Sequence, residues 1–384
     1  METFAALCGI GLERVVSNEL KKLNLTIIDS RPGKVRFQAD IRGCYLALLS
    51  LRTVDRVLWE TARFSAANFD DLFDGIREIP WERYIPQGMG LHVEKIRINK
   101  NRTGALRGVT TIQAMVHKAI AERLCAKYAI LRLPEDPVAE VRVHIEGDQV
   151  EVLLDCSGEP LFKRGYRTAG GIAPLRETSA AALLFLANWR RKYPLYDPFC
   201  GAGTIVIEAA MYAWDMAPGL SRSFALSALA QADKAAEAEI RRDLWERVDF
   251  TRTIRIYGSD DDPRMIALAR ANLSRAYKQG RGSPADPAGL PSLEILPMQK
   301  LRPKEKEEGV IITNPPYGNR IGTVDSAERI YREMDGLATA FSGWKLGVVT
   351  DHPGFESHFG KKADSCREFI NGAVQAYFYQ FEKL

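Results

Sequence analysis

The sequence lacks the features of several protein classes. Its 384 residues contain no run of eighteen apolar residues, which a membrane-spanning helix requires. The N-terminal segment Met-Glu-Thr-Phe-Ala-Ala-Leu-Cys has no basic region followed by a long apolar region, so it does not read as a secretion signal. The six cysteines form no Cys-x-x-Cys pair, which argues against a disulfide framework or a zinc site. We therefore expect a cytoplasmic protein with free thiols and no membrane partner.

Two common nucleotide-binding motifs are also absent. Residues 195–204 read L-Y-D-P-F-C-G-A-G-T, and Gly201 and Gly203 predict a tight turn between a strand and a helix. A dinucleotide site would have a third glycine at position 206, which is valine, and no Gly-Lys-Ser/Thr of a P-loop is present. The five histidines show no metal-ligand spacing. The turn therefore favours a ligand without a pyrophosphate, and Asp197 at the strand end could accept from an ammonium group.

What is present indicates two parts. The first half alternates short strands and helices, with hairpin signals at Arg31-Pro32-Gly33 and Gly147-Asp148, and predicts an α+β region with small antiparallel sheets. From about residue 195, strands followed by helices predict a parallel, doubly wound α/β sheet. Asn371-Gly372 predicts a closing antiparallel hairpin. We expect domains at 1–160 and 161–384, strands at 195–199, 254–258, 310–313 and 345–350, and a helical insertion at 221–248.

Two further segments carry candidate chemistry. Residues 256–263, I-Y-G-S-D-D-D-P, place Asp260 and Asp261 at the end of the second strand, where such sheets hold a ribose diol. By itself this cluster reads more simply as a helix N-cap. Residues 311–322, I-I-T-N-P-P-Y-G-N-R-I-G, end a buried strand in two prolines, which fix a rigid corner at the ligand-binding edge of the sheet.

In order along the chain, these three segments resemble motifs I, II and IV of the S-adenosylmethionine-dependent amino-methyltransferases. The resemblance implies a cofactor site at Asp197, Phe199, Gly201, Gly203, Asp260 and Asp261 and a catalytic set of Asn314, Pro315, Pro316 and Tyr317. An exocyclic amino group is a poor nucleophile until hydrogen-bond acceptors turn its lone pair toward the methyl carbon. The Asn314 side-chain oxygen and the Pro315 carbonyl would be those acceptors, and Tyr317 would stack on a flipped base.

Residues 162–180 and 95–127 resemble the RNA methylase family with an N-terminal THUMP domain. Its best-known type is the N-terminal half of the fused bacterial large-subunit ribosomal RNA methyltransferase, which makes N2-methylguanosine. The resemblance implies a Rossmann-like methyltransferase domain after a ferredoxin-like and THUMP region, with the THUMP core at about 50–157. It also places Thr178 in the cofactor pocket. The usual acidic residue of motif III is missing from 293–299, where Gln299 or a backbone carbonyl near Met298 would substitute.

Three basic clusters suggest a nucleic-acid footprint. Residues 95–107 hold five cations and no acid, and 163–167 and 190–192 add smaller groups. A single basic run is more often a solvated surface. The candidate RNA contacts are Lys95, Arg97, Lys100, Arg102, Arg107, Lys163, Arg164 and Arg167.

Several functions remain open at this stage. The leading one is methylation of guanine N2 in ribosomal RNA, followed by a transfer RNA guanine methyltransferase of the same architecture. A non-catalytic RNA-binding or ribosome-assembly protein would not need an intact Asn314. A methyltransferase for a glutamine amide in protein has a similar motif. A carbon-5 pyrimidine enzyme would need a cysteine nucleophile, whereas Cys200 lies in the cofactor turn and is read as a packing residue.

Overall fold

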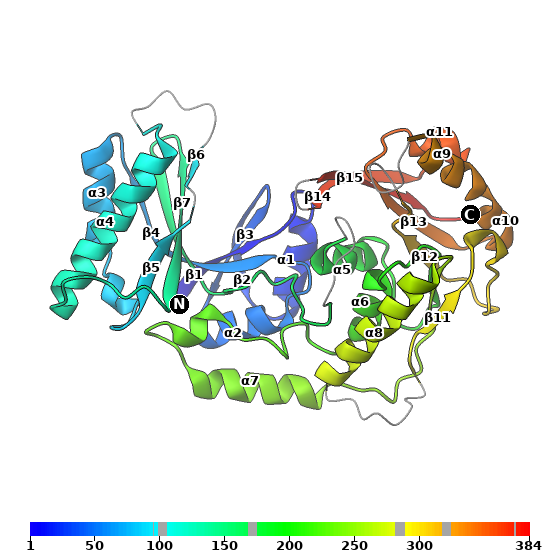
Figure 1. Cartoon of the computed structure of the whole chain (residues 1–384), viewed down its shortest axis with the longest axis horizontal. Helices are drawn as coiled ribbons and strands as arrows, with labels where there is room; N and C mark the ends of the chain where they lie inside the picture. Colours follow the sequence, from blue (N-terminus) through cyan, green and yellow to red (C-terminus); the bar gives the residue numbers. More distant parts are fainter. Residues whose placement is uncertain (95, 99–105, 168–174, 281–288, 317–323, 372–373) are drawn as a thin grey trace.

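The computed structural model describes residues 1–94, 96–98, 106–167, 175–280, 289–316, 324–371 and 374–384. The chain forms an elongated molecule in which two sheets, each with flanking helices, lie end to end (Figure 1). The strands are β1 Glu2–Leu7, β2 Thr26–Arg31, β3 Lys34–Ala39, β4 Arg56–Ser65, β5 Gly90–Val93, β6 Arg97–Ile98, β7 Val138–Glu146, β8 Gln149–Asp155, β9 Leu195–Asp197, β10 Ile256–Asp260, β11 Ser292–Ile295, β12 Val310–Thr313, β13 Lys345–Thr350, β14 Ser365–Asn371 and β15 Val374–Phe381. The helices are α1 Glu13–Lys22, α2 Ile41–Ser50, α3 Phe69–Glu78, α4 Val109–Tyr128, α5 Glu177–Leu186, α6 Thr204–Ala213, α7 Lys234–Glu246, α8 Pro263–Gln279, α9 Val324–Glu333, α10 Asp335–Ala340 and α11 Phe355–Phe359, with short 3-10 turns at Trp81–Arg83, Ala225–Ala228 and Met298–Lys300.

One continuous sheet runs through the N-terminal half. Its order is β2-β3-β1-β4-β8-β7-β5, with β6 also pairing β7. The expectation of several small antiparallel sheets is wrong because β4 is long enough to pair along both edges. Its first half pairs with β1 and the rest with β8. The sheet is also mixed, since β5 and β6 run parallel to β7.

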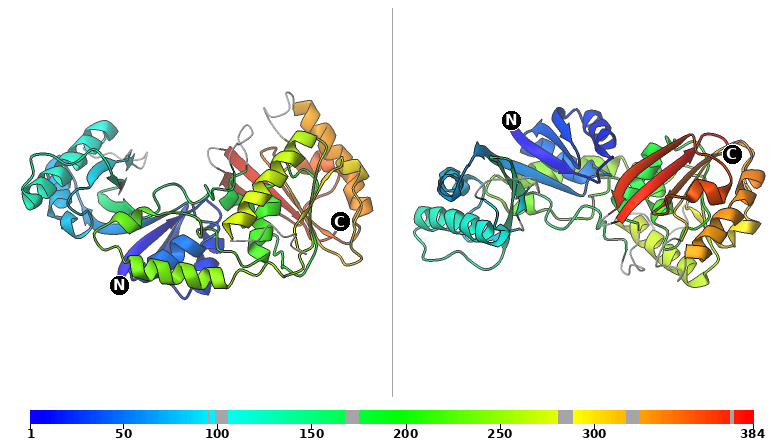
Figure 2. Two further views of the ribbon diagram at one scale, coloured as in Figure 1. Left: turned by 60° about the horizontal axis from the view of Figure 1, so that its bottom comes forward. Right: turned by 90° about the horizontal axis from the view of Figure 1, so that it is seen from above.

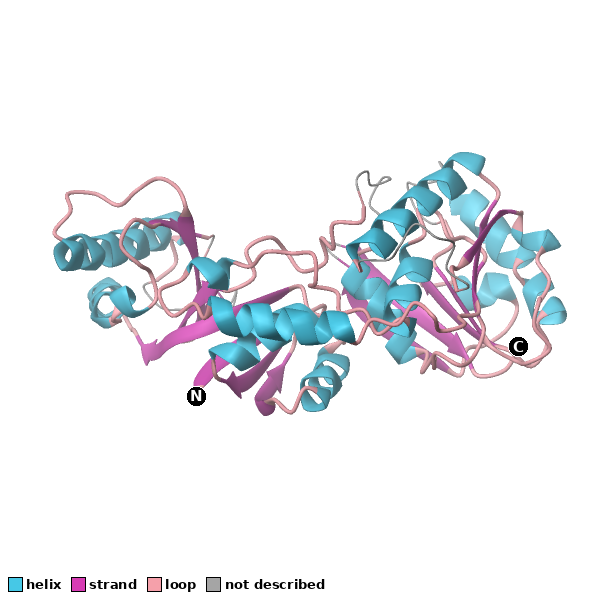
Figure 3. Cartoon of the chain, turned by 90° about the horizontal axis from the view of Figure 1, so that it is seen from below, coloured by secondary structure: helices cyan, strands magenta, loops and turns pink. Residues whose placement is uncertain are grey.

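The second sheet has the order β11-β10-β9-β12-β13-β15-β14. Five strands are parallel, and β15 joins β13 antiparallel. Helices cover both faces (Figure 3). Along β12, Val310 and Ile312 pack into one core and Ile311 into another on the opposite face. This arrangement confirms the α/β methyltransferase fold, and it brings the carboxyl ends of β9, β10 and β12 to one edge.

The local hairpin signals are confirmed. β2 pairs with β3 and β7 with β8, and β14 pairs with β15 up to the residue on each side of the turn. That turn, 372–373, lies outside the described residues. The second strand of the second sheet begins at Ile256, two residues later than expected, and β11 was not predicted. Helices α9 to α11 were also missed. Among the described helices, none has the length and apolar character needed to cross a bilayer.

The expected insertion between the first two strands of the second sheet packs on the N-terminal half. Its helix α7 lies along α2 (Figures 1 and 2). Gly219 N donates to the Leu49 carbonyl at 2.9 Å, and Ala230 N donates to the Tyr84 carbonyl at 2.8 Å. The ion pair between Arg42 and Glu239, at 2.7 Å, joins the two helices. The two halves are therefore interlocked.

The C-terminal hairpin makes a second junction with the N-terminal half. A Cβ added at Gly9 would lie 2.7 Å from the Ile370 carbonyl oxygen, and one at Gly11 would lie 2.6 Å from that of Glu368. Gly11 also has a φ of +93°, which disfavours any other residue. Glycine at these two positions lets β14 approach the turn after β1.

Candidate active site

The glycine turn between β9 and α6 opens one wall of a cavity of about 570 Å³. Gly201 and Gly203 have φ values of +51° and +85°. A Cβ at Gly203 would lie 3.1 Å from the Cβ of Ala269, so glycine also permits α8 to pack against this turn. The turn thus positions the N-terminus of α6 at the carboxyl edge of the sheet, where a ligand can approach backbone N–H groups.

Polar side chains from three neighbouring strands line this cavity. Asp197 ends β9, Asp260 ends β10 and Asn314 follows β12. Asp197 Oδ1 accepts from the Thr313 hydroxyl at 2.7 Å and from Phe199 N at 3.2 Å. Asp260 Oδ2 accepts from Gly201 N at 2.9 Å, which ties the second strand to the glycine turn. The predicted N-cap role belongs to Asp262, which accepts from Arg264 N and leaves Asp260 to the cavity.

The two carboxylates make the cavity suited to a cation. Burial raises the pKa of Asp197 from 3.8 to about 7, with the neighbouring Asp260 adding to the increase. Burial also raises the pKa of Asp260. Both shifts arise because ionised carboxylates are poorly solvated there, and a bound positive charge would relieve that cost. Two poorly solvated carboxylates are what a binding site for an ammonium and a sulfonium would be expected to contain.

Asn314 contributes an unusual buried acceptor. Its side-chain oxygen is inaccessible to solvent and has no hydrogen-bond partner among the described residues. Such an atom costs free energy unless a ligand supplies a donor. Because Asn314 lines the same cavity as Asp197, the missing donor would be brought by a molecule bound beside the cofactor position.

Most of the predicted site residues meet at this cavity. Those that line it are Asp197, Phe199, Gly201, Asp260, Asp261, Gln299, Asn314 and Pro316. Gly203 shapes the turn, and Pro315 lies between two lining residues without being one. Tyr317 lies outside the described residues. The prediction that Thr178 lies in the cofactor pocket is wrong. Its buried hydroxyl donates to Asp55 Oδ1 at 2.6 Å, so it links α5 to the N-terminal half and does not line the cavity.

The sequence reasoning missed the contribution of α9. Arg329, Ile330 and Glu333 line the cavity from this helix. Gln299 Nε2 donates to Glu333 Oε2 at 2.5 Å, so an acidic group does lie beside the position where motif III lacks one. The apolar spacing of Ala327, Ile330, Tyr331 and Met334 could have indicated the helix. Its proximity to Gln299 depends on tertiary packing.

Cys200 is excluded as a nucleophile by its environment. The thiol is buried in the cofactor turn, and burial together with Asp197 and Asp260 raises its pKa well above the ordinary value. The thiolate is therefore disfavoured. This agrees with the interpretation of Cys200 as a packing residue, and its Cβ lies where Gly258 leaves room for it.

Two histidines meet a carboxylate near the end of β13, although their sequence spacing did not suggest it. Possible ligand atoms of Glu328, His352 and His358 lie within 4.8 Å of one another. Gly354 N donates to His352 Nδ1 at 3.1 Å, so the neutral ring carries its proton on Nε2, which faces Glu328 at 3.7 Å. A metal would need a lone pair on that nitrogen. His358 Nε2 lies 3.3 Å from the same Glu328 oxygen, so the three side chains form a polar cluster around this carboxylate.

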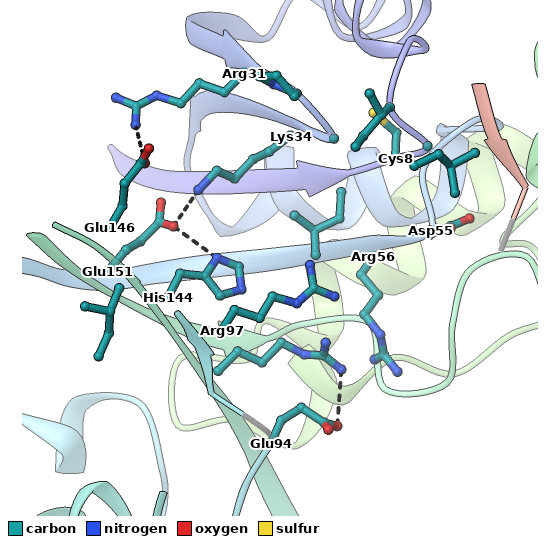
Figure 4. Close-up of a pocket in the computed structure, with 18 of the residues that line it drawn as sticks. Cys8, Arg31, Lys34, Asp55, Arg56, Glu94, Arg97, His144, Glu146 and Glu151 are labelled. Carbon is teal, nitrogen blue, oxygen red and sulfur yellow. Dashed lines mark hydrogen bonds and ion pairs between the residues drawn. The ribbon is translucent and has the colours of Figure 1, made fainter. Parts of the chain in front are cut away.

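A second, larger cavity of about 1000 Å³ lies against the N-terminal sheet (Figure 4). Basic residues from separate strands and loops line it: Arg31, Lys34, Arg56, Arg63, Arg97, Arg142 and Arg176. Several are paired with acids, as in Lys34 with Glu151 at 2.5 Å and Arg176 with Asp55 at 2.8 Å. Arg97 is exposed and has no ion-pair partner among the described residues. Of the eight predicted RNA contacts, Arg97 lines this cavity.

The other predicted RNA contacts have different outcomes. Lys95, Lys100 and Arg102 lie outside the described residues, whereas Arg107 and Lys163 are exposed. The prediction for Arg164 is wrong: it is only 2% exposed, and its guanidinium donates to the carbonyls of Leu161, at 2.6 Å, and Arg52. The prediction for Arg167 is also wrong, because its guanidinium donates to Thr204 Oγ1 at 2.5 Å and stabilises the start of α6. Both cations are structural.

The parallel sheet, glycine turn, acidic strand end and Asn-Pro-Pro corner define an S-adenosylmethionine-dependent methyltransferase. Comparison with known families agrees: residues 164–379 match the family described as "RMKL-like, methyltransferase domain", and residues 3–58 match the "RlmL ferredoxin-like domain". The chain belongs to this methyltransferase family.

Individual relatives extend the similarity over the whole chain. The chain is 35% identical to "Putative RNA methyltransferase YpsC" of Bacillus subtilis (strain 168), over 99% of this chain and 95% of that protein. It is 33% identical to "Ribosomal RNA large subunit methyltransferase K/L" of Syntrophotalea carbinolica, over 99% of this chain but 53% of that protein, so it spans about half the length of such relatives. The crystal structure of "SMU.472, a putative methyltransferase complexed with SAH" superposes with a TM-score of 0.89 and 33% identity, covering 100% of this chain and 98% of the other.

Proposed function

We propose that the protein methylates an exocyclic amino group of an RNA base, with guanine N2 in 23S ribosomal RNA as the target. The observation that carries this proposal is the buried, unpartnered side-chain oxygen of Asn314, a residue that lines the same cavity as Asp197. An amino group donating to that oxygen supplies the missing hydrogen bond. A methyl acceptor with an NH₂ group is therefore the chemistry that this corner fits.

The cavity also fits the cofactor. The Asp197 carboxylate would receive the ammonium of S-adenosylmethionine, and Asp260 would accept from its ribose hydroxyls. The backbone at Gly201 permits close approach. Gln299 and Glu333 present acceptors and donors for the adenine edge. When bound, the cofactor supplies a methyl group on a positively charged sulfur.

The residues of the corner act by orientation. Asn314 Oδ1 and the Pro315 carbonyl would accept the two amino hydrogens, which turns the nitrogen lone pair out of conjugation with the ring. The two prolines hold these acceptors in place before the substrate arrives. No side chain needs to form a covalent bond, in agreement with the suppressed thiolate of Cys200. Proximity and orientation supply the rate.

We infer that the RNA docks on the N-terminal cavity. The two cavities adjoin along the backbone, because Leu175 lines the cofactor cavity and Arg176 lines the basic one. Ile370 of β14 also lines the basic cavity, so both halves of the molecule form its wall. We propose that residues 1–160 capture RNA and residues 161–384 perform the transfer, as the charge distribution suggests.

The choice of ribosomal RNA as the substrate follows the names of the relatives. Large subunit methyltransferases K/L act, by their name, on ribosomal RNA, and they share this chain's full length as part of a longer protein. A transfer RNA guanine methyltransferase remains the second candidate because the Asn-Pro-Pro corner recognises an amino group and not a particular RNA. A cytoplasmic location follows from either substrate.

The test is mass mapping of modified nucleosides in ribosomal and transfer RNA from a strain lacking the gene. Loss of one N2-methylguanosine from 23S RNA, restored by the wild-type gene and not by Asn314→Ala, is the expected result. Loss from a transfer RNA would support the second candidate. If Asn314→Ala restored the modification fully while binding cofactor normally, the role given to Asn314 would be refuted. A methylated protein glutamine with unchanged RNA would overturn the RNA substrate.

The salt dependence of RNA binding tests whether RNA docks on the N-terminal cavity. Arg97→Ala should weaken RNA binding and reduce the dependence of log Kd on log salt concentration by about 1, since one phosphate contact is lost. Arg264→Ala is the matched control, because Arg264 is exposed on α8 and lines neither cavity. An equal salt dependence for Arg97→Ala and wild type would refute the assignment.

A further inference from the structure

Thr313 is a buried residue that the proposed mechanism does not use. It ends β12, is 0% exposed and directly precedes Asn314. Its hydroxyl donates to Asp197 Oδ1 at 2.7 Å. One short hydrogen bond therefore connects the strand that carries the cofactor carboxylate with the strand that carries the amino acceptor.

Backbone pairing between β9 and β12 ends before it reaches Asp197 and Thr313. β9 and β12 pair only through Leu195 with Val310 and Tyr196 with Ile311. Asp197 and Thr313 lie beyond the last residues that pair between β9 and β12. Their side-chain hydrogen bond joins the two strands at the edge where both ligands would bind.

We propose that Thr313 is a positioning residue that couples the two halves of the site. Its hydroxyl fixes the Asp197 carboxylate for the cofactor's ammonium, while its backbone holds Asn314 for the substrate amino group. This inference rests on the proposed function for the identity of both ligands. It adds a residue that touches neither of them.

The hydrogen-bond pattern around Asp197 supports this role. Thr313 and Phe199 both donate to Oδ1, and no described residue donates to Oδ2. The carboxylate is thereby anchored at one oxygen, and the other remains for a ligand. Asp197 lines the cavity, so a ligand can reach it.

Removing the hydroxyl has a predictable effect on cofactor binding. The Thr313 hydrogen bond lowers the pKa of Asp197, opposing the larger effect of burial. Without it the carboxylate would hold its proton to a higher pH. Because the ammonium needs the ionised form, affinity should decline tenfold per pH unit below that pKa. Loss of the hydrogen bond should move the midpoint of this decline up by about one pH unit.

The experiment measures S-adenosylhomocysteine binding by calorimetry from pH 5.5 to 9. This product keeps the ammonium and needs no RNA. Thr313→Val should raise the pH midpoint by about one unit and weaken binding about fivefold at pH 7, and Thr313→Ser should restore both. Thr350→Val is the matched control, since Thr350 is buried on the adjacent strand and its hydroxyl contacts Tyr331 instead of Asp197.

The outcomes separate this inference from the proposed function. If wild type binds and Thr313→Val shows the same midpoint, or serine fails to restore it, the positioning role is refuted. If wild type does not bind S-adenosylhomocysteine at all, the proposed function itself fails. Should the valine variant not fold by circular dichroism, Thr313→Ala removes the same hydroxyl and is read in the same way.

Discussion

Replacing Asp197 with asparagine should stabilise the cofactor-free protein at the cost of cofactor binding. Asparagine keeps an oxygen that can accept from Thr313 and Phe199, but it carries no charge. Burial raises the pKa of Asp197 from 3.8 to about 7, a difference that corresponds to about 4 kcal/mol of free energy. That energy is what the folded wild type loses by burying an ionised carboxylate.

The gain in stability from Asp197→Asn should increase with pH. Folded Asp197 holds a proton more tightly than unfolded Asp197, so its contribution to stability is fully present below pH 3.8 and is lost as the pH rises to about 7. The difference in unfolding free energy between Asp197→Asn and wild type should therefore grow from near zero at pH 4 to about 4 kcal/mol at pH 8.

Urea denaturation at pH 4, 6 and 8 measures this difference, with calorimetry of S-adenosylhomocysteine binding on the same samples. Asp261→Asn is the control, because Asp261 lines the same cavity but is exposed. It should show no comparable pH-dependent gain. A difference for Asp197→Asn that is constant from pH 4 to 8 would refute the reasoning, as would unchanged affinity for the ligand.

Two further variants test the packing. Gly11→Ala should destabilise the protein by about 2 kcal/mol in urea, because the new Cβ would meet the Glu368 carbonyl at 2.6 Å. Gly88→Ala, which also has positive φ but nothing within 4 Å, should cost about 1 kcal/mol; equal losses would contradict the contact argument. Arg164→Ala should cost about 3–5 kcal/mol, because the buried Glu208 carboxylate loses its Arg164 ion pair and keeps the Tyr166 hydroxyl, whereas the exposed Lys163→Ala should change stability by less than about 0.5 kcal/mol. A loss for Arg164→Ala as small as that for Lys163→Ala would contradict the structural role given to Arg164.

The parts of the structure that the sequence predicted are those specified locally. Arg31-Pro32-Gly33 encodes its turn because proline and glycine restrict or extend the backbone within three residues. The glycine turn, Asp260 and Asn314 were predicted to meet because parallel strands place their carboxyl ends at one edge. The cofactor cavity confirms that they do.

The parts that were missed depend on partners distant in sequence. Arg164 lies in a basic run typical of a solvated surface, yet it is buried against Glu208 and the Arg52 carbonyl. Thr178 is near the cofactor turn in sequence, but Asp55 of the N-terminal half binds its hydroxyl. No local pattern distinguishes such a residue from an exposed one.

The packing of the insertion on α2 has a consequence for synthesis on the ribosome. The backbone of Leu49 is bonded by Gly219, and that of Tyr84 by Ala230, so part of the N-terminal surface is completed by chain made much later. A nascent chain of 160 residues has all the strands of its sheet but not this cover. We expect the N-terminal half to keep apolar surface exposed until about ninety more residues have emerged. A fragment that ends at residue 160 would keep this apolar surface exposed. The boundary expected from the sequence therefore does not separate two independently stable halves.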